Sequence, residues 1–357
     1  MEKLRVGIVG CGGMGTWFHA PAYDKMENAE LVGFCDIIPE KAQKLADQYG
    51  VKNVFTDYND LINMDGIDAI DICTPNYMHS VIAVAALNKG LHVFCEKPDA
   101  INTVEAQKMK DAAEASGKTL MVMRNNRYMP ISSFTKKYIE DGNMGEIYAA
   151  RCGWQRRRGI PGKGGWFTTK AQSGGGPLID LGVHMIDLTM WLMGNPTPVS
   201  VVGSTYSKFA DSDASDSEHS KFGEKKAEGT FDVEDLAMGF IKFDNGACLQ
   251  LEFSWASNID TESRYFELRG TKSGAMWTSN SDEKVRFYTE ENGNIVDYVP
   301  NIDNNRGIGH HEANLRHFVD VVVNGTEPMF VPQQGLNMVK ILEAIYKSAE
   351  TGKEVTL

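Results

Sequence analysis

The chain has 357 residues, with 36 lysines and arginines against 48 aspartates and glutamates, and a formal net charge of −12. Because single cores stop growing at roughly 250 to 300 residues, this length predicts two domains. The acidic balance would repel a polyphosphate backbone, so a nucleic-acid partner is not expected.

Membrane and secretory signals are not expected either. No run approaches the roughly 20 apolar residues that cross a bilayer, and the opening MEKLRVGIVG has no signal-peptide pattern before its first strand. The six cysteines are scattered without CxxC spacing, which indicates reduced core thiols rather than a zinc site. We therefore expect a cytoplasmic protein.

The first 125 residues alternate short apolar runs with helical patterns. In chain order these are LRVGIVG, a helix from about Met14, ELVGFCD, a helix over 39–49, AIDICT, a helix over 79–89, LHVFCE, a helix over 104–116, and TLMVM. Such alternation predicts an α/β fold in which a doubly wound parallel sheet, the Rossmann arrangement, carries helices on both faces. We place this domain at residues 1–125.

The pattern of apolar and polar residues changes after Arg124. Runs such as EIYAARCGW, LAMGFIKF and ACLQLEFSW are longer and alternate apolar with polar residues, and FDNGA between two of them predicts a tight hairpin. Residues 126–357 are thus expected to form an α+β domain with a large open, mainly antiparallel sheet. Helices are expected over about 178–193, 311–324 and 332–350, and the last two are candidates to pack back on the first domain.

One stretch of this second region differs in composition. Residues 209–232 are polar and charged with few aromatic residues, which predicts an exposed loop of little intrinsic order.

A glycine-rich turn follows the first predicted strand. IVGCGGMG places Gly10, Gly12 and Gly15 in GxGxxG spacing, where glycines permit a tight turn and close approach of a pyrophosphate to a helix N-terminus. Asp36 ends the second strand 21 residues after Gly15, where a carboxylate accepts hydrogen bonds from ribose hydroxyls and repels a 2′-phosphate. The pattern predicts NAD rather than NADP; the alternative is a glycine turn with a helix-capping aspartate.

A second motif lies near the middle of the chain. SGGGPLIDLGVHMIDLTMWLMG sets Asp180, His184 and Asp187 at spacings of four and three, on one helical face. Such residues can share a metal ion, but nothing nearby completes a shell, so no metal is expected. A lone histidine on an apolar face is also often a core residue.

Together these motifs resemble those of the Gfo/Idh/MocA family, which includes glucose-fructose oxidoreductase and inositol dehydrogenase. The resemblance rests on the GxGxxG turn, the EKP tripeptide at Glu96–Pro98, and the GGGxxxDxGxHxxD stretch, and it covers nearly the whole chain. It implies that Lys97, Asp180 and His184 converge on the substrate carbinol. It also implies a cis Lys97-Pro98 bond.

The chemistry assigns a role to each member of this trio. His184 is the base that accepts the hydroxyl proton, Asp180 orients it or binds the sugar, and Lys97 stabilises the oxygen. The base role is assigned in some relatives to the lysine and in others to the histidine, so both assignments stay open.

The resemblance also implies the residues that bind the cofactor and the substrate. The cofactor set is Gly10, Gly12, Gly13, Met14, Gly15, Asp36, Thr74, Pro75, Asn76, His79, Glu96 and Lys97, although Asn76 could instead cap an ordinary helix. The substrate set is Lys97, Asn126, Arg127, Tyr128, Arg156, Trp166, Asp180 and His184. Residues 126–128 are included for their place at the domain junction and could equally staple the interdomain hinge. Arg156 and Trp166 are included because their loop joins arginines to flat aromatic rings, although arginine runs are usually solvated.

The expected substrate is a sugar, glycoside or cyclic polyol, oxidised at one secondary hydroxyl, with carbon 3 of a glucopyranosyl unit as the specific hypothesis. Two alternatives are a glycosidase or lyase that uses tightly bound NAD for transient oxidation, and a dinucleotide-sensing regulator without turnover. A large open sheet has a face to cover, so a homo-oligomer is expected.

Overall fold

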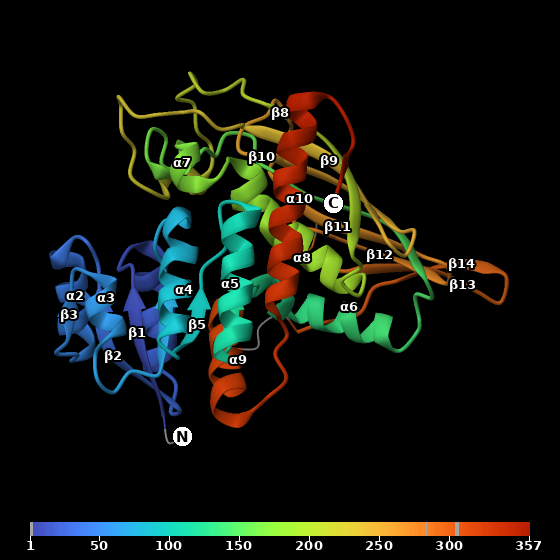
Figure 1. The fold of residues 1–357 in the computed structure, drawn as a ribbon. Coiled ribbons are helices and arrows are strands. Elements are labelled where there is room, and N and C mark those ends of the chain that lie inside the picture. Colours follow the sequence, from blue (N-terminus) through green and yellow to red (C-terminus); the bar gives the residue numbers. More distant parts are fainter. Residues whose placement is uncertain (1–2, 281, 283, 304–306) are drawn as a thin grey trace. The chain divides into compact units, whose positions relative to one another are not determined.

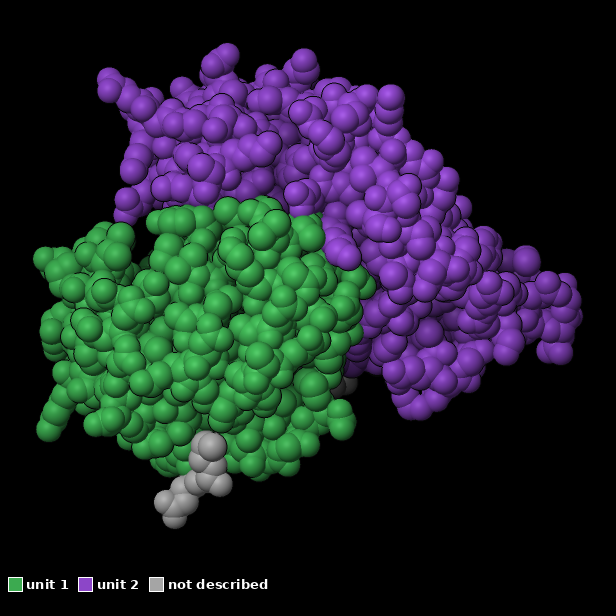
Figure 2. Space-filling view, viewed as in Figure 1, with its two compact units in different colours: residues 1–125, 308–339 green, residues 126–307, 340–357 purple. Residues whose placement is uncertain are grey.

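A computed structural model describes residues 3–280, 282, 284–303 and 307–357 of the chain. The chain divides into two compact units (Figure 2). Unit 1 comprises residues 1–125 and 308–339, and unit 2 comprises residues 126–307 and 340–357. Helix α10 (Pro332–Thr351) contributes residues to both units.

Unit 1 is built, within the described residues, on a six-stranded parallel sheet (Figure 1). The strand order β3-β2-β1-β4-β5-β6 reverses direction between β1 and β4, which confirms the predicted Rossmann arrangement. The strands are β1 (Leu4–Val9), β2 (Ala29–Cys35), β3 (Val54–Phe55), β4 (Ala69–Ile72), β5 (His92–Cys95) and β6 (Leu120–Val122).

Local sequence explains where most helices of unit 1 begin and end. Pro39 stands at the first turn of α2, and Gly50 ends it with φ +68°, a conformation that glycine adopts at little cost. The Asn102 side chain accepts from the Glu105 amide at the start of α5. The helices are α1 (Ala20–Asp24), α2 (Pro39–Tyr49), α3 (Tyr58–Ile62), α4 (His79–Asn88), α5 (Thr103–Ser116) and α9 (His310–Asn324).

The first helical segment differs from a regular α-helix. A π-helix covers Gly15–His19 before α1, and the amide of Ala20 bonds back to the carbonyl of Gly15. This wide turn buries the His19 side chain completely.

Unit 2 is built on a mixed sheet of nine strands in its described part, in the order β14-β13-β12-β11-β7-β10-β9-β8-β15. Only the β7–β10 pair among these is parallel, so the predicted mainly antiparallel sheet is confirmed. The strands are β7 (Ile147–Gln155), β8 (Pro198–Tyr206), β9 (Leu236–Phe243), β10 (Cys248–Ser254), β11 (Ser263–Gly270), β12 (Ser273–Thr278), β13 (Arg286–Glu291), β14 (Asn294–Tyr298) and β15 (Val355–Thr356).

The predicted FDNGA hairpin joins β9 to β10. Lys242 pairs with Cys248 across the turn, and Gly246 adopts φ +84° there.

Helices cover one face of this sheet. Helix α8 (Val183–Leu192) packs on β7 and β11, and every one of its residues except His184 is buried. A helix that is apolar on all sides belongs in a core, so His184 marks where the helix leaves that core. The other helices of this unit are α6 (Pro130–Glu140) and α7 (Lys170–Ser173).

The segment 209–232 is exposed, as predicted, but the expectation of little order is wrong. Its backbone amides bond to the earlier stretch 158–168, with Lys226 donating to the carbonyl of Lys163 at 2.9 Å and Asp232 to that of Thr168 at 3.1 Å. Residues Glu218–Lys221 form a 3-10 helix. The local composition could not show this order, because the partners lie about sixty residues earlier in the chain.

Two observations concern the cysteines and the helices. The six cysteines are all free thiols. Among the described helices, none combines the length and apolar character needed to traverse a bilayer.

A buried carboxylate fixes the glycine turn in front of α8. Glu234 accepts hydrogen bonds from the amides of Gly176 (2.9 Å) and Leu178 (3.1 Å) and from the Tyr346 hydroxyl (2.9 Å). Burial raises the pKa of Glu234, and the three donors oppose that rise by stabilising its charge.

We expect Tyr346→Phe to lower the free energy of unfolding by about 1–3 kcal/mol, because it removes one donor from a buried acceptor. The urea midpoint followed by circular dichroism measures this. Tyr148→Phe, at a tyrosine that is 50% exposed, is the matched control and should leave the midpoint unchanged. Equal midpoints for both variants would contradict the assigned role of Tyr346.

Candidate active site

The carboxyl ends of the unit 1 strands gather the predicted cofactor residues. Ligands of such sheets bind outside this edge, at the point where the strand order reverses. The loops concerned follow β1, β2, β4 and β5, and they carry residues 10–15, Asp36, residues 74–79, and Glu96 with Lys97.

The glycines after β1 have distinct roles. An added Cβ at Gly10, which has φ +99°, would lie 2.6 Å from the carbonyl of Cys73, and one at Gly15 would lie 2.4 Å from the Gly10 oxygen. A Cβ at Gly12 would meet no atom within 4 Å in the described part of the chain. Gly10 and Gly15 are therefore needed for packing, whereas Gly12 leaves open space beside a helix N-terminus, which suits a pyrophosphate.

Asp36 is oriented by the backbone. Its two carboxylate oxygens accept from the amides of Cys11 (2.8 Å) and Ile38 (2.9 Å). A carboxylate has further acceptor sites, and Asp36 is only half-buried. The residues present thus fit NAD: Asp36 would accept from the adenosine ribose, and Gly12 would leave room for the phosphates.

The loop after β4 contributes mainly backbone. His79 is fully buried, with its ring nitrogens 2.7 Å from the Pro98 oxygen and 2.9 Å from the Thr74 oxygen. Burial lowers the pKa of His79, while the hydrogen bonds to the two carbonyls oppose that shift. This geometry makes His79 a link between two loops, while Thr74, Pro75 and the 7%-exposed Asn76 form the loop itself.

Lys97 follows β5 directly, and its peptide bond to Pro98 is cis, as the family resemblance implies. The backbone amide of Lys97 donates to Glu96 Oε2 at 3.0 Å. Glu96 Oε1 lies 2.9 Å from His19 Nε2. The buried His19 side chain, which belongs to the first helical segment, thus contacts the tripeptide Glu96–Pro98 through Glu96.

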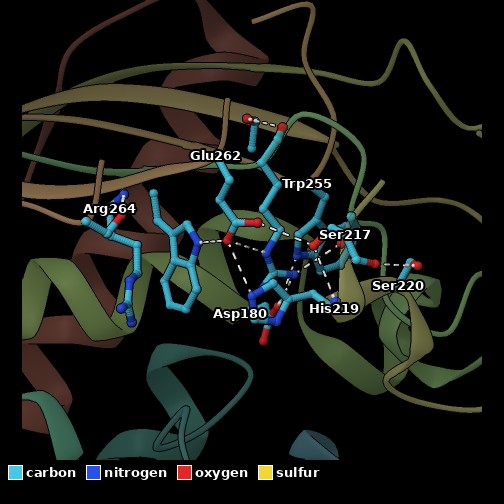
Figure 3. Close-up of polar contacts among 12 residues, drawn as sticks. Asp180, Ser217, His219, Ser220, Trp255, Glu262 and Arg264 are labelled. Carbon is cyan, nitrogen blue, oxygen red and sulfur yellow. Dashed lines mark hydrogen bonds and ion pairs between the residues drawn. The ribbon is translucent and has the colours of Figure 1, made fainter. Parts of the chain in front are cut away.

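Unit 2 holds Asp180 and His184 at one edge of its sheet. Asp180 lies on a π-helix (Leu178–Gly182) that runs into α8, so its wider turn replaces the regular helix expected for this spacing. Asp180 Oδ2 accepts from Trp255 Nε1 at 3.0 Å, and Arg156 Nη1 lies 4.0 Å away (Figure 3). A hydrogen-bonded carboxylate of this kind keeps one orientation.

A second carboxylate in unit 2 was not predicted from the sequence. Glu262 accepts from Trp154 Nε1 at 2.8 Å and lies 3.3 Å from His219 Nε2 (Figure 3). Burial would raise the pKa of Glu262, but these hydrogen bonds and the charge of Arg156 lower it to about 2. The Trp154 ring centroid is 6.0 Å from that of His184, so this charged cluster adjoins the predicted base.

The remaining predicted substrate residues are placed differently from one another. Arg127 is 1% exposed and makes a bidentate ion pair with Asp187 at 2.6 and 2.8 Å, which favours the structural alternative for Arg127. Asn126 Nδ2 donates to the His184 carbonyl at 3.5 Å. Tyr128 is half-buried, as is Trp166, which stacks on Phe167 with ring centroids 3.9 Å apart.

The structure therefore assembles two separate groups. Within unit 1 it connects the glycine loop, Asp36, the loop after β4, and the Glu96–Lys97 pair. Within unit 2 it brings Asp180, Arg156 and Trp255 together, and it adds Glu262, Trp154 and His219. Glu262 and His219 could not be found from the sequence, since both lie in polar segments without a motif.

Two family models match the chain. Residues 4–124 match the model described as oxidoreductase family, NAD-binding Rossmann fold, and residues 136–357 match that described as oxidoreductase family, C-terminal alpha/beta domain.

Individual relatives agree with these models. The chain is 35% identical to a D-glucoside 3-dehydrogenase of Escherichia coli, over 100% of this chain and 98% of the relative. It is 32% identical to a levoglucosan dehydrogenase of Pseudarthrobacter phenanthrenivorans, over 80% of this chain and 76% of the relative.

A solved structure of a levoglucosan dehydrogenase in complex with NADH has a TM-score of 0.85 and 25% identity, with 99% of each chain covered. Another, GenD2 from gentamicin A biosynthesis in complex with NAD, has a TM-score of 0.79 and 27% identity, with 100% of this chain and 97% of that chain covered. The chain thus belongs to the Gfo/Idh/MocA oxidoreductase family, as an NAD-binding enzyme with a Rossmann domain and a C-terminal α/β domain.

Proposed function

We propose that this NAD-dependent sugar dehydrogenase oxidises the hydroxyl at carbon 3 of a glucopyranosyl unit in a glycoside. The observation that carries the proposal is the full-length likeness to a D-glucoside 3-dehydrogenase, in a chain that has Lys97, Asp180 and His184. The product would be the 3-keto glycoside.

Each step of the proposed reaction has a group to perform it. NAD, held at the glycine loop and Asp36, would supply the hydride acceptor. His184, the one residue of α8 that is not buried, takes the hydroxyl proton as base. Asp180, whose carboxylate is oriented by Trp255, holds His184 or a sugar hydroxyl in place. Lys97 places a positive charge at the oxygen as the carbonyl forms.

The aromatic and charged cluster of unit 2 supports a sugar substrate. Glu262 and His219 offer hydrogen-bonding groups, and Glu262 is oriented by the buried Trp154, whose ring packs against Arg156 and Arg264. Sugar sites use a small number of such oriented polar groups for specificity.

The proposal is tested by offering the purified chain, with NAD+, a panel of methyl glucosides, free glucose, levoglucosan and myo-inositol. We expect reduced nicotinamide to accumulate with a glucoside and the product to be lighter by two hydrogens in mass spectrometry. Oxidation of inositol alone would contradict the substrate class. Glycoside cleavage without reduced nicotinamide would instead support transient oxidation by bound NAD.

Asp36 is proposed to set the cofactor preference. In Asp36→Asn we expect NAD+ affinity to fall about tenfold, because neutral amides accept hydrogen bonds from the ribose more weakly. NADP+ affinity should rise, because the repulsion of its 2′-phosphate is removed. Titration of intrinsic fluorescence measures both. Asp47→Asn, at an exposed carboxylate of α2, is the control, and equal preference in wild type and Asp36→Asn would contradict the role.

Lys97 is proposed to act on the substrate oxygen. Lys97→Met should lower kcat about 100- to 1000-fold, the scale on which one oxyanion-stabilising donor acts, while the NAD+ dissociation constant changes less than about threefold. Lys89→Met removes an exposed lysine of the same unit and should retain full activity. Comparable kcat values in the two variants would exclude the role.

We also propose a homo-oligomer that pairs the uncovered face of the unit 2 sheet. Val202 (47% exposed) pairs with Phe240 (40% exposed) across β8 and β9, and Tyr206 and Met238 extend this apolar surface. Light scattering after gel filtration should give a multimer for wild type and a smaller species for Phe240→Lys. Val104→Lys, on an exposed valine of α5, should not change the mass. A monomeric wild type would contradict this proposal.

A cytoplasmic location is proposed as well, because six free thiols suit a reducing compartment. Cell fractionation would test it.

A further inference from the structure

A hydrogen-bonded cluster of charged side chains lies at the carboxyl ends of the unit 1 strands. His19 is 0% exposed; its Nδ1 is 2.7 Å from Asp71 Oδ2 and its Nε2 is 2.9 Å from Glu96 Oε1. Asp71 belongs to β4, and Glu96 follows β5. One side chain from the first helical segment thus bridges the ends of two neighbouring strands.

The donors and acceptors define the charge of this bridge. Carboxylates accept hydrogen bonds, so a ring that faces one at each nitrogen must carry both protons and be an imidazolium. Burial is the largest single influence and opposes that charge, but Asp71 and Cys73 together outweigh it and raise the pKa of His19 well above 6.5. Burial would likewise raise the pKa of Glu96, yet its bond to His19 lowers it to about 2.

The other groups around the ring are consistent with this state. The Cys73 thiol lies 3.8 Å from Asp71 Oδ1, and Tyr23 on α1 is buried beside the same carboxylate. His311 on α9 and Lys97 both lie close enough to Glu96 to favour its ionised form. Two carboxylates against one buried imidazolium leave the cluster with net negative charge next to Lys97.

A metal site is the competing interpretation. His19, Asp71 and Cys73 offer ligand atoms that lie within 4.8 Å of one another. Metal binding needs a deprotonated ring nitrogen and a thiolate. Both ring nitrogens of His19 already face carboxylate oxygens, and burial raises the pKa of Cys73 to about 12. The hydrogen-bonded bridge therefore accounts for the geometry better.

The bridge continues to the candidate catalytic lysine. Glu96 uses its second oxygen, Oε2, to accept from the backbone amide of Lys97 at 3.0 Å. Without its hydrogen bond to His19, the Glu96 carboxylate would be free to rotate. Its hydrogen bond from the Lys97 amide would then be lost. A shift of about 1 Å in a catalytic group can cost about 100-fold in rate.

We propose that His19 is a positioning residue: as a buried imidazolium it locks the Glu96 carboxylate, which in turn fixes the backbone from which Lys97 reaches the substrate. The rate effect of this role rests on the function proposed above. The charge state of His19 and the hydrogen bond from the Lys97 amide to Glu96 do not depend on that function.

The first test is His19→Gln, because glutamine cannot donate from two sides to two carboxylates. We expect kcat to fall about 10- to 100-fold with the NAD+ dissociation constant within about threefold of wild type. Hydrogen exchange at the Lys97 amide should accelerate more than exchange in the β1 and β4 strands. The matched control is His92→Gln, since His92 lies on β5 and contacts the Thr119 amide rather than a carboxylate. An unchanged kcat, or exchange that rises equally throughout unit 1, would overturn the proposal.

The second test uses the wild-type full chain and does not depend on the variant folding or on activity. Histidine labelled with nitrogen-15 should show both His19 ring nitrogens protonated at pH 8, and metal analysis should show no bound zinc. A deprotonated ring nitrogen, or one zinc per chain, would overturn the proposal. Confirmed protonation in a chain that oxidises no sugar would instead count against the proposed function alone.

Discussion

Buried charges that must be paired organise both units of this protein. Removing an ion from water costs several kcal/mol unless hydrogen bonds and an opposite charge replace the solvent. His19 meets that requirement between Asp71 and Glu96, and Arg127 meets it against Asp187. Each pair fixes a segment next to a candidate site residue: the Lys97 turn in unit 1, and helix α8 with His184 in unit 2. Because each buried charge must stay beside its partner, the pair also fixes the position of the segments that carry the two residues.

The parts of the fold that depend on local sequence could be predicted from it. The parallel sheet of unit 1 follows from apolar strands alternating with helices, and Gly50 and Asn102 mark helix ends through their own backbone preferences. The hairpin after Phe243 follows from Asn245 and Gly246. The GxGxxG turn could be recognised from the spacing of its glycines, of which Gly15 is required by a close contact with Gly10 in the same loop.

Features that depend on distant partners could not be predicted this way. His19 looks like any histidine in a helix, and only the fold brings Asp71 and Glu96 to its two nitrogens. His219 lies in the segment 209–232, whose composition indicated only an exposed loop, and Glu262 lies outside every motif that the sequence offered. Arg127 stood next to a motif and was a substrate candidate, but the structure buries it against Asp187. Whether a charged residue serves packing or chemistry depends on contacts made across the sheet.

The central claim is that the chain removes a hydride from carbon 3 of a glucoside and delivers it to NAD. The most direct measurement offers methyl glucosides carrying deuterium at carbon 2, 3 or 4 and follows the label by mass spectrometry. The account predicts deuterium in the reduced nicotinamide only from the substrate labelled at carbon 3. Transfer from carbon 2 or 4, or from none of the three, would contradict it.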